Sequence, residues 1–460
     1  MTTIASVVDF GAVGDGGTDD TAAFETAIKI LQENGGGILV VTSNRYLIRP
    51  INLTSHMVLE LQADTTILGM ADEDAWPVIQ DAPNTSLGPH LTSLIHGDHL
   101  ENVTIQGYGN SSVVDGQGAY WWDKAHKNTL KYKRGRMIEF FHSRDVSVFD
   151  IRMVNAPYWN NHFFDCDNVH VARVAIEAPE HSPNTDGWDP NSSRNVLIED
   201  SHYAAGDDCV AIKSGWDCYG VDYDTPSVNI TVRNVTCHGF SAGIAIGSEM
   251  SGGISNVTVQ HVRFTKANKP VDIKVSKKRG GYVRDVVYRD IHITGSIQRA
   301  IHVDMYHYND SPNPACSTDW TPPTMTDVSN LTFLRFNGTD ATFAGNPRFP
   351  DEAFHLLAYD QSPVRNVYMQ DLYFSTPASG VGWNCSAVHG VIRNNSVTPW
   401  PPCEGFTIVD ASDDSGTGLI NAYAIRFYQH ASCSAQRSLL FWLSLAMSVL
   451  FVRRSQGRNN

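Results

Sequence analysis

The chain is poor in charge, and above all in positive charge. Only 18% of its 460 residues are charged, and 34 Lys and Arg stand against 49 Asp and Glu, which gives a formal net charge of −15. A protein with this balance does not attract a polyanion through its overall field, which argues against a nucleic-acid partner. An anionic ligand would need a locally basic cleft against this background.

The chain also lacks the CxxC spacing of a structural zinc site, and we expect neither a metal ion nor a cofactor. An even number of cysteines suits an oxidising compartment. About a dozen Asn-x-Ser/Thr sequons, Asn52 and Asn337 among them, suit a secreted glycoprotein, although Asn-Val-Thr is also typical of a turn before a β-strand. The eight cysteines are Cys166, Cys209, Cys218, Cys237, Cys316, Cys385, Cys403 and Cys433.

What the chain does contain is a loose repeat. From about residue 58 to 375, an Asn or Asp turn residue is followed again and again by alternating apolar residues, at a spacing of roughly 22–30 residues where copies are adjacent. Alternation indicates strands, and the absence of long helical patterns between copies argues against βαβ units. The repeat predicts a single-stranded parallel β-helix, an all-β solenoid. The copies begin at Asn102, Asp145, Asn168, Asn195, Asn256, Asp285 and Asn366.

One helix is expected near the N-terminus, from about Thr18 to Glu33. Apolar residues recur there at helical spacing, Thr18 or Asp19 provides a cap, and three glycines from Gly35 end the helix. A buried strand over residues 38–41 follows. Because the open end of a stacked β fold needs protection, we expect this helix to cover it.

Two acidic clusters lie in the middle of the repeat. The first is Asn184-Thr185-Asp186 and the second is Gly206-Asp207-Asp208, and 21 residues separate Asp186 from Asp207. That distance is about one solenoid coil, so the three carboxylates are expected in one small patch. Such a patch serves acid/base hydrolysis or a metal site of oxygen ligands, whereas either cluster alone would be ordinary turn residues.

These segments resemble the polygalacturonase family, glycoside hydrolase family 28. The motifs NTDGWDP (from Asn184), GDDCVAIKSG (from Gly206), IGSEMSGG (from Ile246) and RGGY (from Arg279) follow the family's order, and VDFGAVGDG (from Val8) is similar to the opening of many pectin-active β-helix proteins. The resemblance implies a right-handed parallel β-helix and inverting hydrolysis of galacturonan-type pectin.

The resemblance also implies roles. Asp207 is expected to be the general acid, and Asp186 with Asp208 to activate the water. Repulsion among the three should raise at least one carboxyl pKa. Substrate-binding candidates are Asn184, Lys213, Lys274 and Tyr306. Two of these keep an equal alternative, because Lys213 could be ion-paired with a nearby aspartate and Tyr306 could be an ordinary surface tyrosine.

Two positions depart from the family pattern. The place of a Gly-His-Gly histidine holds Ala242, and the arginine of an Arg-Ile-Lys motif is replaced by Asp272. Arginine would bind a galacturonate carboxylate, whereas aspartate would repel it, which leaves room for a modified or branched uronic polymer. Two other functions therefore stay open: a pectate-lyase-type eliminase, and a catalytically silent pectin-binding wall protein.

The resemblance further implies cysteine pairs and a location. Relatives suggest Cys209–Cys237, and Cys385–Cys403 is expected as a clip near the C-terminus. No signal peptide precedes Val8, and because the family works outside the cytosol we expect a secreted monomer whose beginning is missing from this sequence.

The C-terminal part is expected to leave the solenoid. We assign residues 1–409 to the catalytic β-helix, 410–437 to a linker and 438–460 to an apolar tail. The apolar run 439–452 would span about 21 Å as a helix, which is short of the roughly 30 Å hydrocarbon core of a membrane. It is interpreted equally as a short membrane anchor, a cleaved lipid-anchor signal or a mistranslated exon.

Overall fold

The computed structural model describes residues 2–80, 83, 88–241, 243–307, 316–317, 319–343, 350–378, 380–400 and 402–410. Apart from Asp410, the predicted linker and tail lie outside these residues, as do Ala242 and Cys433. Within the described ranges no helix is both long enough and apolar enough to cross a membrane. The unit Met1–Thr407 forms the fold described below.

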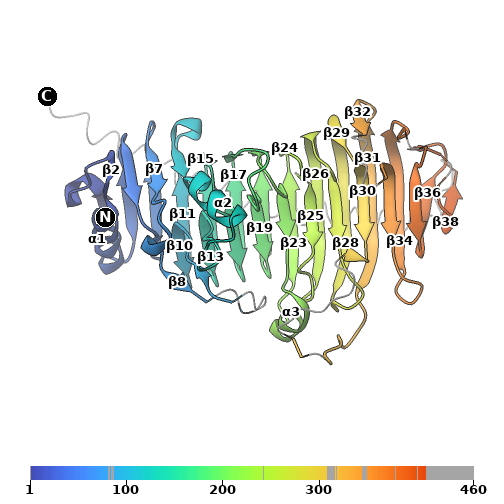
Figure 1. Ribbon diagram of the computed structural model, residues 1–460, viewed down its shortest axis with the longest axis horizontal. Coiled ribbons are helices and arrows are strands. Elements are labelled where there is room, and N and C mark those ends of the chain that lie inside the picture. The colour runs from blue at the N-terminus through green and yellow to red at the C-terminus, as the bar shows by residue number, and fades with distance from the viewer. Residues whose placement is uncertain are drawn as a thin grey trace. The chain divides into compact units, whose positions relative to one another are not determined.

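This unit is a parallel β-helix, which confirms the predicted fold class. Its strands stack side by side from α1 at the N-terminal end towards the C-terminal coils (Figure 1). Each coil contributes a strand to an 11-stranded parallel sheet, here called the groove sheet because it carries the acidic residues, and further strands to a 23-stranded sheet. The pairings of both sheets along the stack are parallel.

The groove sheet consists of β5 Ile51–Asn52, β10 Ile95–Asp98, β13 Ile138–Phe141, β16 Asn161–Phe164, β19 Trp188–Asn191, β22 Val210–Ile212, β25 Ile244–Gly247, β27 Val271–Lys274, β30 Arg299–Asp304, β33 Glu352–Leu357 and β35 Trp383–Ser386.

The 23-stranded sheet has two series of strands. The first is β1 Ile4–Ser6, β3 Gly37–Val41, β6 Met57–Leu61, β11 Glu101–Gln106, β14 Arg144–Phe149, β17 Asp167–Ala172, β20 Arg194–Glu199, β23 Ser227–Arg233, β26 Ile254–Lys266, β28 Tyr282–Ile293, β31 Asp327–Gly338, β34 Val364–Phe374, β36 Val388–Arg393 and β38 Phe406–Val409. The second is β2 Asp15–Asp19, β4 Arg45–Ile48, β7 Thr66–Gly69, β12 Val113–Asp115, β15 Arg152–Val154, β18 Ala175–Glu177, β21 His202–Ala204, β24 Thr236–His238 and β37 Val397–Thr398.

Shorter elements lie in the connections. They are α1 Thr21–Glu33, α2 Gly118–His126, α3 Asp217–Tyr223, the 3-10 turns Val7–Phe10, Glu73–Ala75 and Gly109–Ser111, the antiparallel pair β8 Val78–Ile79 and β9 His90–Leu91, and the pair β29 Gly295–Ile297 and β32 Ala341–Phe343. The sequence pattern did not predict α2 or α3.

Helix α1 lies at the end of the stack, as predicted, but it begins at Thr21 rather than about Thr18. Residues Asp15–Asp19 pair with β4 instead. The Asp20 carboxylate accepts hydrogen bonds from the backbone N–H groups of Val13 and Gly14, so it fixes the preceding turn and does not cap the helix. The predicted strand 38–41 is confirmed as β3, Gly37–Val41.

The predicted repeat corresponds to a ladder of turn residues. Asn195 has φ 57°, in the left-handed region that Asn tolerates better than most residues. Its side-chain Nδ2 donates to Asp167 Oδ1 at 2.7 Å, and its Oδ1 accepts from Asn229 Nδ2 at 2.7 Å. Asn229 in turn accepts from Asn256 at 3.3 Å. Each turn residue of this ladder therefore starts a strand and holds the next coil in register.

The interior of the solenoid is apolar, and the described residues form three disulfides. Cys209–Cys237 and Cys385–Cys403 confirm the expected pairs, while Cys218–Cys316 was not foreseen. Cys166 is a buried free thiol. Disulfides of this kind fit an oxidising compartment.

The ladder gives a stability test. Asn195→Ala should lower the free energy of unfolding by about 1–3 kcal/mol, because alanine is strained at φ > 0 and loses both side-chain hydrogen bonds. Asn195→Gly should lose less, because glycine relieves the strain. Thermal and denaturant unfolding of both variants measures the difference. If alanine and glycine were equally destabilising, the backbone conformation would not be what Asn195 contributes.

Candidate active site

The two predicted acidic clusters meet at the edge of the groove sheet. Trp188 of β19 is in register with Val210 of β22, so Asp186 and Asp208, each two residues before its partner, occupy equivalent places on neighbouring coils. Carboxylate oxygens of Asp186, Asp207 and Asp208 all lie within 4.8 Å of one another. The sequence prediction of one carboxylate patch is confirmed.

The turn before β22 brings two consecutive aspartates into the patch. Residues Ala205–Asp207 form bends, so Asp207 and Asp208 escape the strand rule that would point them to opposite faces. Gly206 is needed here because an added Cβ would lie 2.0 Å from the Ser182 carbonyl oxygen. The buried Tyr203 hydroxyl lies 2.7 Å from the Asp207 carbonyl oxygen and accepts from the Asp207 N–H at 3.0 Å, which fixes the turn from below.

Asn184 links the first cluster to the second. Its backbone is left-handed, with φ 56°. Its Oδ1 accepts from Arg134 at 2.8 Å, and its Nδ2 lies 3.5 Å from Asp207 Oδ2. The Arg134 guanidinium is buried, donates to the carbonyls of Pro157 and Pro183, and lies over the Tyr158 ring at 4.6 Å. Arg134 therefore positions the Asn184 turn.

Lys213 lies beneath the patch as an ion-paired residue. Its Nζ is 3.5 Å from both Asp189 Oδ1 and Glu249 Oε2, and it lies 4.8 Å from the Trp159 ring centroid. With only 5% of its surface exposed, Lys213 neutralises buried acids, which is the alternative that the sequence left open for it.

Lys274 contacts the catalytic candidates directly. Its Nζ donates to Asp208 Oδ2 at 2.6 Å, and the side chain retains 16% exposure. Burial would lower the Lys274 pKa, but Asp208 and Asp272 raise it, so the lysine is charged. This cation balances one of the three carboxylates.

Asp272 does not present a bare charge to the groove. It is 6% exposed, accepts from His302 Nδ1 at 2.7 Å and lies 3.5 Å from Lys269 Nζ. Burial alone would raise its pKa, but His302 and Lys269 lower it well below the usual range. The expected repulsion of a substrate carboxylate is therefore offset by neighbouring groups.

The pKa is raised in two of the three neighbouring acids. Burial, with Asp207 and Asp189 nearby, raises the pKa of Asp186 well above its ordinary value. Burial and Asp208 raise the pKa of Asp207 to about 6. A raised carboxyl pKa was predicted, but burial outweighs the repulsion from which it was predicted.

The remaining acids explain how Lys213 keeps its charge. Burial raises the Asp189 pKa to about 8 despite the nearby lysine, whereas Lys213 and Arg279 overcome burial and lower the Glu249 pKa to about 2. Glu249 is therefore the ionised partner of Lys213, and Asp189 keeps its proton.

One other predicted position lies away from the cluster. Tyr306 is 40% exposed, packs against Tyr359 with ring centroids 4.0 Å apart, and donates to the Ala358 carbonyl at 3.3 Å. It follows β30, two coils beyond Gly247 of β25. The nearby His238, which is not a predicted site residue, belongs to β24 in the other sheet, so it does not replace the histidine that the sequence lacks.

Sequence reasoning missed Arg134, which holds Asn184, and a buried acid on the groove sheet two coils before β19. Glu139 is fully buried and pairs with His162 at 2.8 Å and Arg136 at 3.4 Å, with His90 and His96 nearby. Arg134 and Glu139 stand in no recognisable motif, so only the fold reveals them. Glu249 is the acidic residue of the IGSEMSGG motif, so this motif could have been used to predict it.

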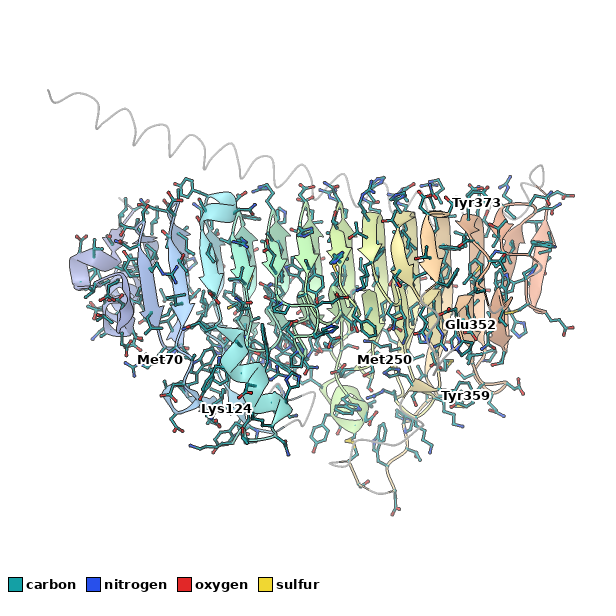
Figure 2. All side chains as sticks on the ribbon, turned by 45° about the horizontal axis from the view of Figure 1, so that its top comes forward. Met70, Lys124, Met250, Glu352, Tyr359 and Tyr373 are labelled. Atoms are coloured by element: carbon teal, nitrogen blue, oxygen red, sulfur yellow. A yellow bond between two sulfur atoms is a disulfide. The ribbon has the colours of Figure 1, made fainter. Side chains whose placement is uncertain are left out.

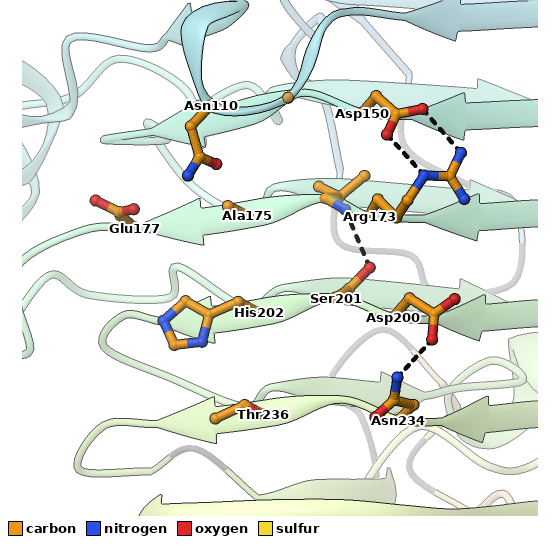
Figure 3. Close-up of a pocket in the computed structure, with 12 residues that line it drawn as sticks. Asn110, Asp150, Arg173, Ala175, Glu177, Asp200, Ser201, His202, Asn234 and Thr236 are labelled. Carbon is orange, nitrogen blue, oxygen red and sulfur yellow. Dashed lines mark hydrogen bonds and ion pairs between the residues drawn. The ribbon is translucent and has the colours of Figure 1, made fainter.

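A separate depression of about 560 Å³ lies on the other sheet. Figure 3 shows its polar lining, in which Arg173 binds Asp150 through two hydrogen bonds and Asn234 donates to Asp200. None of the acidic cluster lines it. We take the cluster as the candidate site, because within the described ranges only there do buried carboxylates with raised pKa values converge.

Comparisons with known proteins identify the family of the chain. The sequence profile of Glycosyl hydrolases family 28 matches residues 39–397. A probable polygalacturonase of Vitis vinifera is 34% identical over 86% of this chain and 79% of its own.

Solved structures show the same fold. An exopolygalacturonase from Thermotoga maritima superposes with a TM-score of 0.67 at 23% identity, over 89% of this chain and 90% of its own. A family 28 exopolygalacturonase from Yersinia enterocolitica gives a TM-score of 0.69 at 19% identity, over 89% and 78%. These β-helices support the right-handed architecture that was expected.

The pKa of Asp207 makes a prediction about stability. A carboxyl with a raised pKa in the folded state favours folding below its unfolded pKa of about 3.9, and this contribution is lost as pH rises through about 6. Asp207→Asn should therefore melt roughly a few degrees higher than the wild type at pH 7.5. At pH 4 the two should melt alike.

Calorimetry at both pH values measures this difference. Asp64→Asn, at an exposed aspartate outside the site, is the matched control and should show no such pH-dependent gain. An Asp207→Asn variant less stable than the wild type at pH 7.5 would contradict the buried-charge argument.

Proposed function

The chain belongs to glycosyl hydrolases family 28, and on that premise we propose that it hydrolyses galacturonic-acid-containing pectin with inversion at the cleaved carbon. As a member of this family it is a glycosidase that acts on O-glycosyl bonds. The observation that carries the proposal is the convergence of Asp186, Asp207 and Asp208 within 4.8 Å. Glycoside hydrolysis needs an acid for the leaving oxygen and a base for water.

Asp207 is the general acid in this proposal. A carboxyl with a pKa of about 6 keeps its proton at mildly acidic pH and can deliver it to the glycosidic oxygen. Asn184 and the Asp208 N–H, which donates to Asp207 Oδ1 at 3.0 Å, orient the acid.

Asp208 and Asp186 activate the attacking water. Lys274 at 2.6 Å keeps Asp208 paired with a cation, so Asp208 is the ionised member. Asp186 Oδ1 is buried and has no hydrogen-bond partner among the described residues, which leaves it for a water. The water proton passes to the ionised Asp208 as the water oxygen attacks the sugar carbon, while Asp186, which holds a proton, binds the water.

The carboxylate spacing alone does not favour inversion. Inverting sites hold their acid and base carboxyl groups about 6.5–9.5 Å apart, whereas retaining sites hold them about 5–5.5 Å apart. Oxygens within 4.8 Å therefore resemble the retaining spacing. Inversion is proposed from the family resemblance, and the anomer of the first product decides between the two.

The substrate is proposed to be a uronic polymer bound in the groove. Lys274 and Lys269 supply positive charge beside the acids, and Asp272 is neutralised where an arginine is usual. Exposed Tyr306 on Tyr359 offers an aromatic surface for a sugar face. The three disulfides support action outside the cytosol. The proposed site of action is the cell wall, and the proposed form is a monomer.

The deciding experiment is hydrolysis of a panel of pectic polymers by the wild type and Asp207→Asn. The wild type should release reducing ends, and the variant should fold but lose about 10²–10⁴-fold in rate, the range for lost general acid catalysis. Proton NMR of the first product should show the anomer opposite to that of the cleaved bond.

Three results would count against the proposal. Products that absorb near 235 nm, the unsaturated uronide band, would indicate an eliminase. Release of no reducing ends from any polymer would indicate a binding protein. Near-wild-type turnover by Asp207→Asn would remove the acidic cluster from the mechanism.

Lys274 should contribute to the chemistry as well as to binding. Lys274→Ala removes a charge-assisted hydrogen bond to Asp208, worth about 1.5–3 kcal/mol, and should lower kcat/KM by about 10–100-fold. A fall in kcat together with a rise in KM is expected, because Asp208 then loses its cation. Lys278→Ala, at an exposed lysine in the turn that follows β27, is the control. A change in KM alone would reduce Lys274 to a substrate ligand.

A further inference from the structure

A second cluster of titratable groups lies on the outer face of β30 and β33. One ligand atom each from His302, Asp304 and His355 lies within 4.8 Å of the other two. His302 and His355 are in register on neighbouring coils, and their rings stack with centroids 4.7 Å apart. Figure 2 places Glu352, at the start of β33, on the lower side of the stack together with Tyr359, whereas Tyr373 lies on the upper side.

Each histidine is held by its own carboxylate. His302 Nδ1 lies 2.7 Å from Asp272 Oδ1, and His355 Nδ1 contacts Glu352 Oε2. Both carboxylates are nine-tenths or more buried. An imidazole that donates one N–H to a carboxylate has a fixed orientation and leaves the lone pair of its other nitrogen for a metal ion.

The remaining nitrogens differ in their partners. His355 is only 4% exposed, and its Nε2 has no hydrogen-bond partner in the part of the chain that the structure describes. A buried imidazole nitrogen left unpaired costs free energy, so it calls for an explanation. His302 Nε2 lies 3.0 Å from Arg299 and 3.7 Å from Asp304 Oδ2. A guanidinium thus already contacts the cluster.

We propose that His302, Asp304 and His355 bind a divalent transition metal ion, with Zn²⁺ as the best match. Two histidines and one carboxylate form a common zinc set that leaves a coordination position open. Asp272 and Glu352 are the carboxylates that orient the two rings. The proposal departs from the expectation of no metal, which rested on cysteine spacing alone.

Metal binding requires small adjustments. Zinc bonds of about 2.0–2.2 Å bring ligand atoms closer together than 4.8 Å, so the side chains must converge. The Arg299 guanidinium must swing away from His302, while its Nε, 3.2 Å from Glu352 Oε2, can keep that ion pair. Asp304 Oδ1 stays occupied by the Tyr306 N–H at 2.8 Å, so Oδ2 is the oxygen that turns to the metal.

The chain offers a matched control. Asp98, His99 and His142 form another group within 4.8 Å, but His99 is 72% exposed and both histidines already share Asp98 Oδ1, at 2.7 and 2.9 Å. This group has no buried unpaired nitrogen and no second carboxylate behind each ring among the described residues, so it is not proposed as a site.

Titration calorimetry of Zn²⁺ alone into the chelator-treated full chain tests the proposal. The wild type and His99→Ala should show one saturable site, and His355→Ala should lose it. Glu352→Gln keeps the ligands but not the orienting charge, and should bind about 10–100-fold more weakly. Visible absorption of bound Co²⁺, present in the wild type and absent from His355→Ala, gives a second readout.

The outcome does not depend on hydrolysis. Absence of saturable Zn²⁺ binding by the wild type would overturn the site, and so would equal affinity in His355→Ala or loss of binding in His99→Ala. Circular dichroism checks that each variant is folded. If His355→Ala does not fold, Glu352→Gln decides, and an unchanged affinity in that variant also overturns the proposal.

Discussion

Parallel register is the constraint on which the rest of this structure depends. Neighbouring strands are about 4.8 Å apart, so each side chain lies directly over its equivalent on the next coil. On the inner face this is favourable, because apolar residues such as Val210, Ile244 and Val271 stack into a continuous core. On the outer face it brings charges together. Asp186 over Asp208 is the clearest case.

The stacked acids on the groove sheet therefore require compensation of their negative charge, and this is achieved in different ways. Lys274 neutralises Asp208, and Lys213 neutralises Glu249. Asp186 and Asp189 have no such cation to themselves, so burial raises their pKa values and they hold protons. The raised pKa that a catalytic acid requires then needs no additional structural feature. It follows from stacking more carboxylates than cations in a buried row, at a cost in stability.

What the sequence predicted depended on local signals. The Asn and Asp residues that start each coil were recognisable because left-handed turns and alternating strands are short-range features. Asp186 was brought together correctly with Asp207 and Asp208 because the spacing of the two clusters is about one coil, and its equivalent on the next coil is Asp208. Contacts between residues far apart in sequence could not be predicted, because the connections between the strands vary in length. Arg134 reaches Asn184 from 50 residues away, and Cys218 joins Cys316 across 98 residues, so no spacing rule finds either. The start of helix α1 was predicted too early because Asp15–Asp19 form a strand that pairs with β4.

Asp272 shows why a single departure from a family pattern must be considered with its neighbours. An arginine at this position would face Lys269 and would leave His302 Nδ1 without its acceptor. Aspartate and histidine on adjacent coils therefore form a matched pair, and the change at 272 is compensated rather than isolated. The positive charge of this part of the groove then resides on Lys269, Lys274 and Arg299. We expect recognition of a uronate beyond the acidic cluster to use these cations instead of one bidentate arginine. Lys274 ends β27, Lys269 lies just before that strand, and Arg299 begins β30.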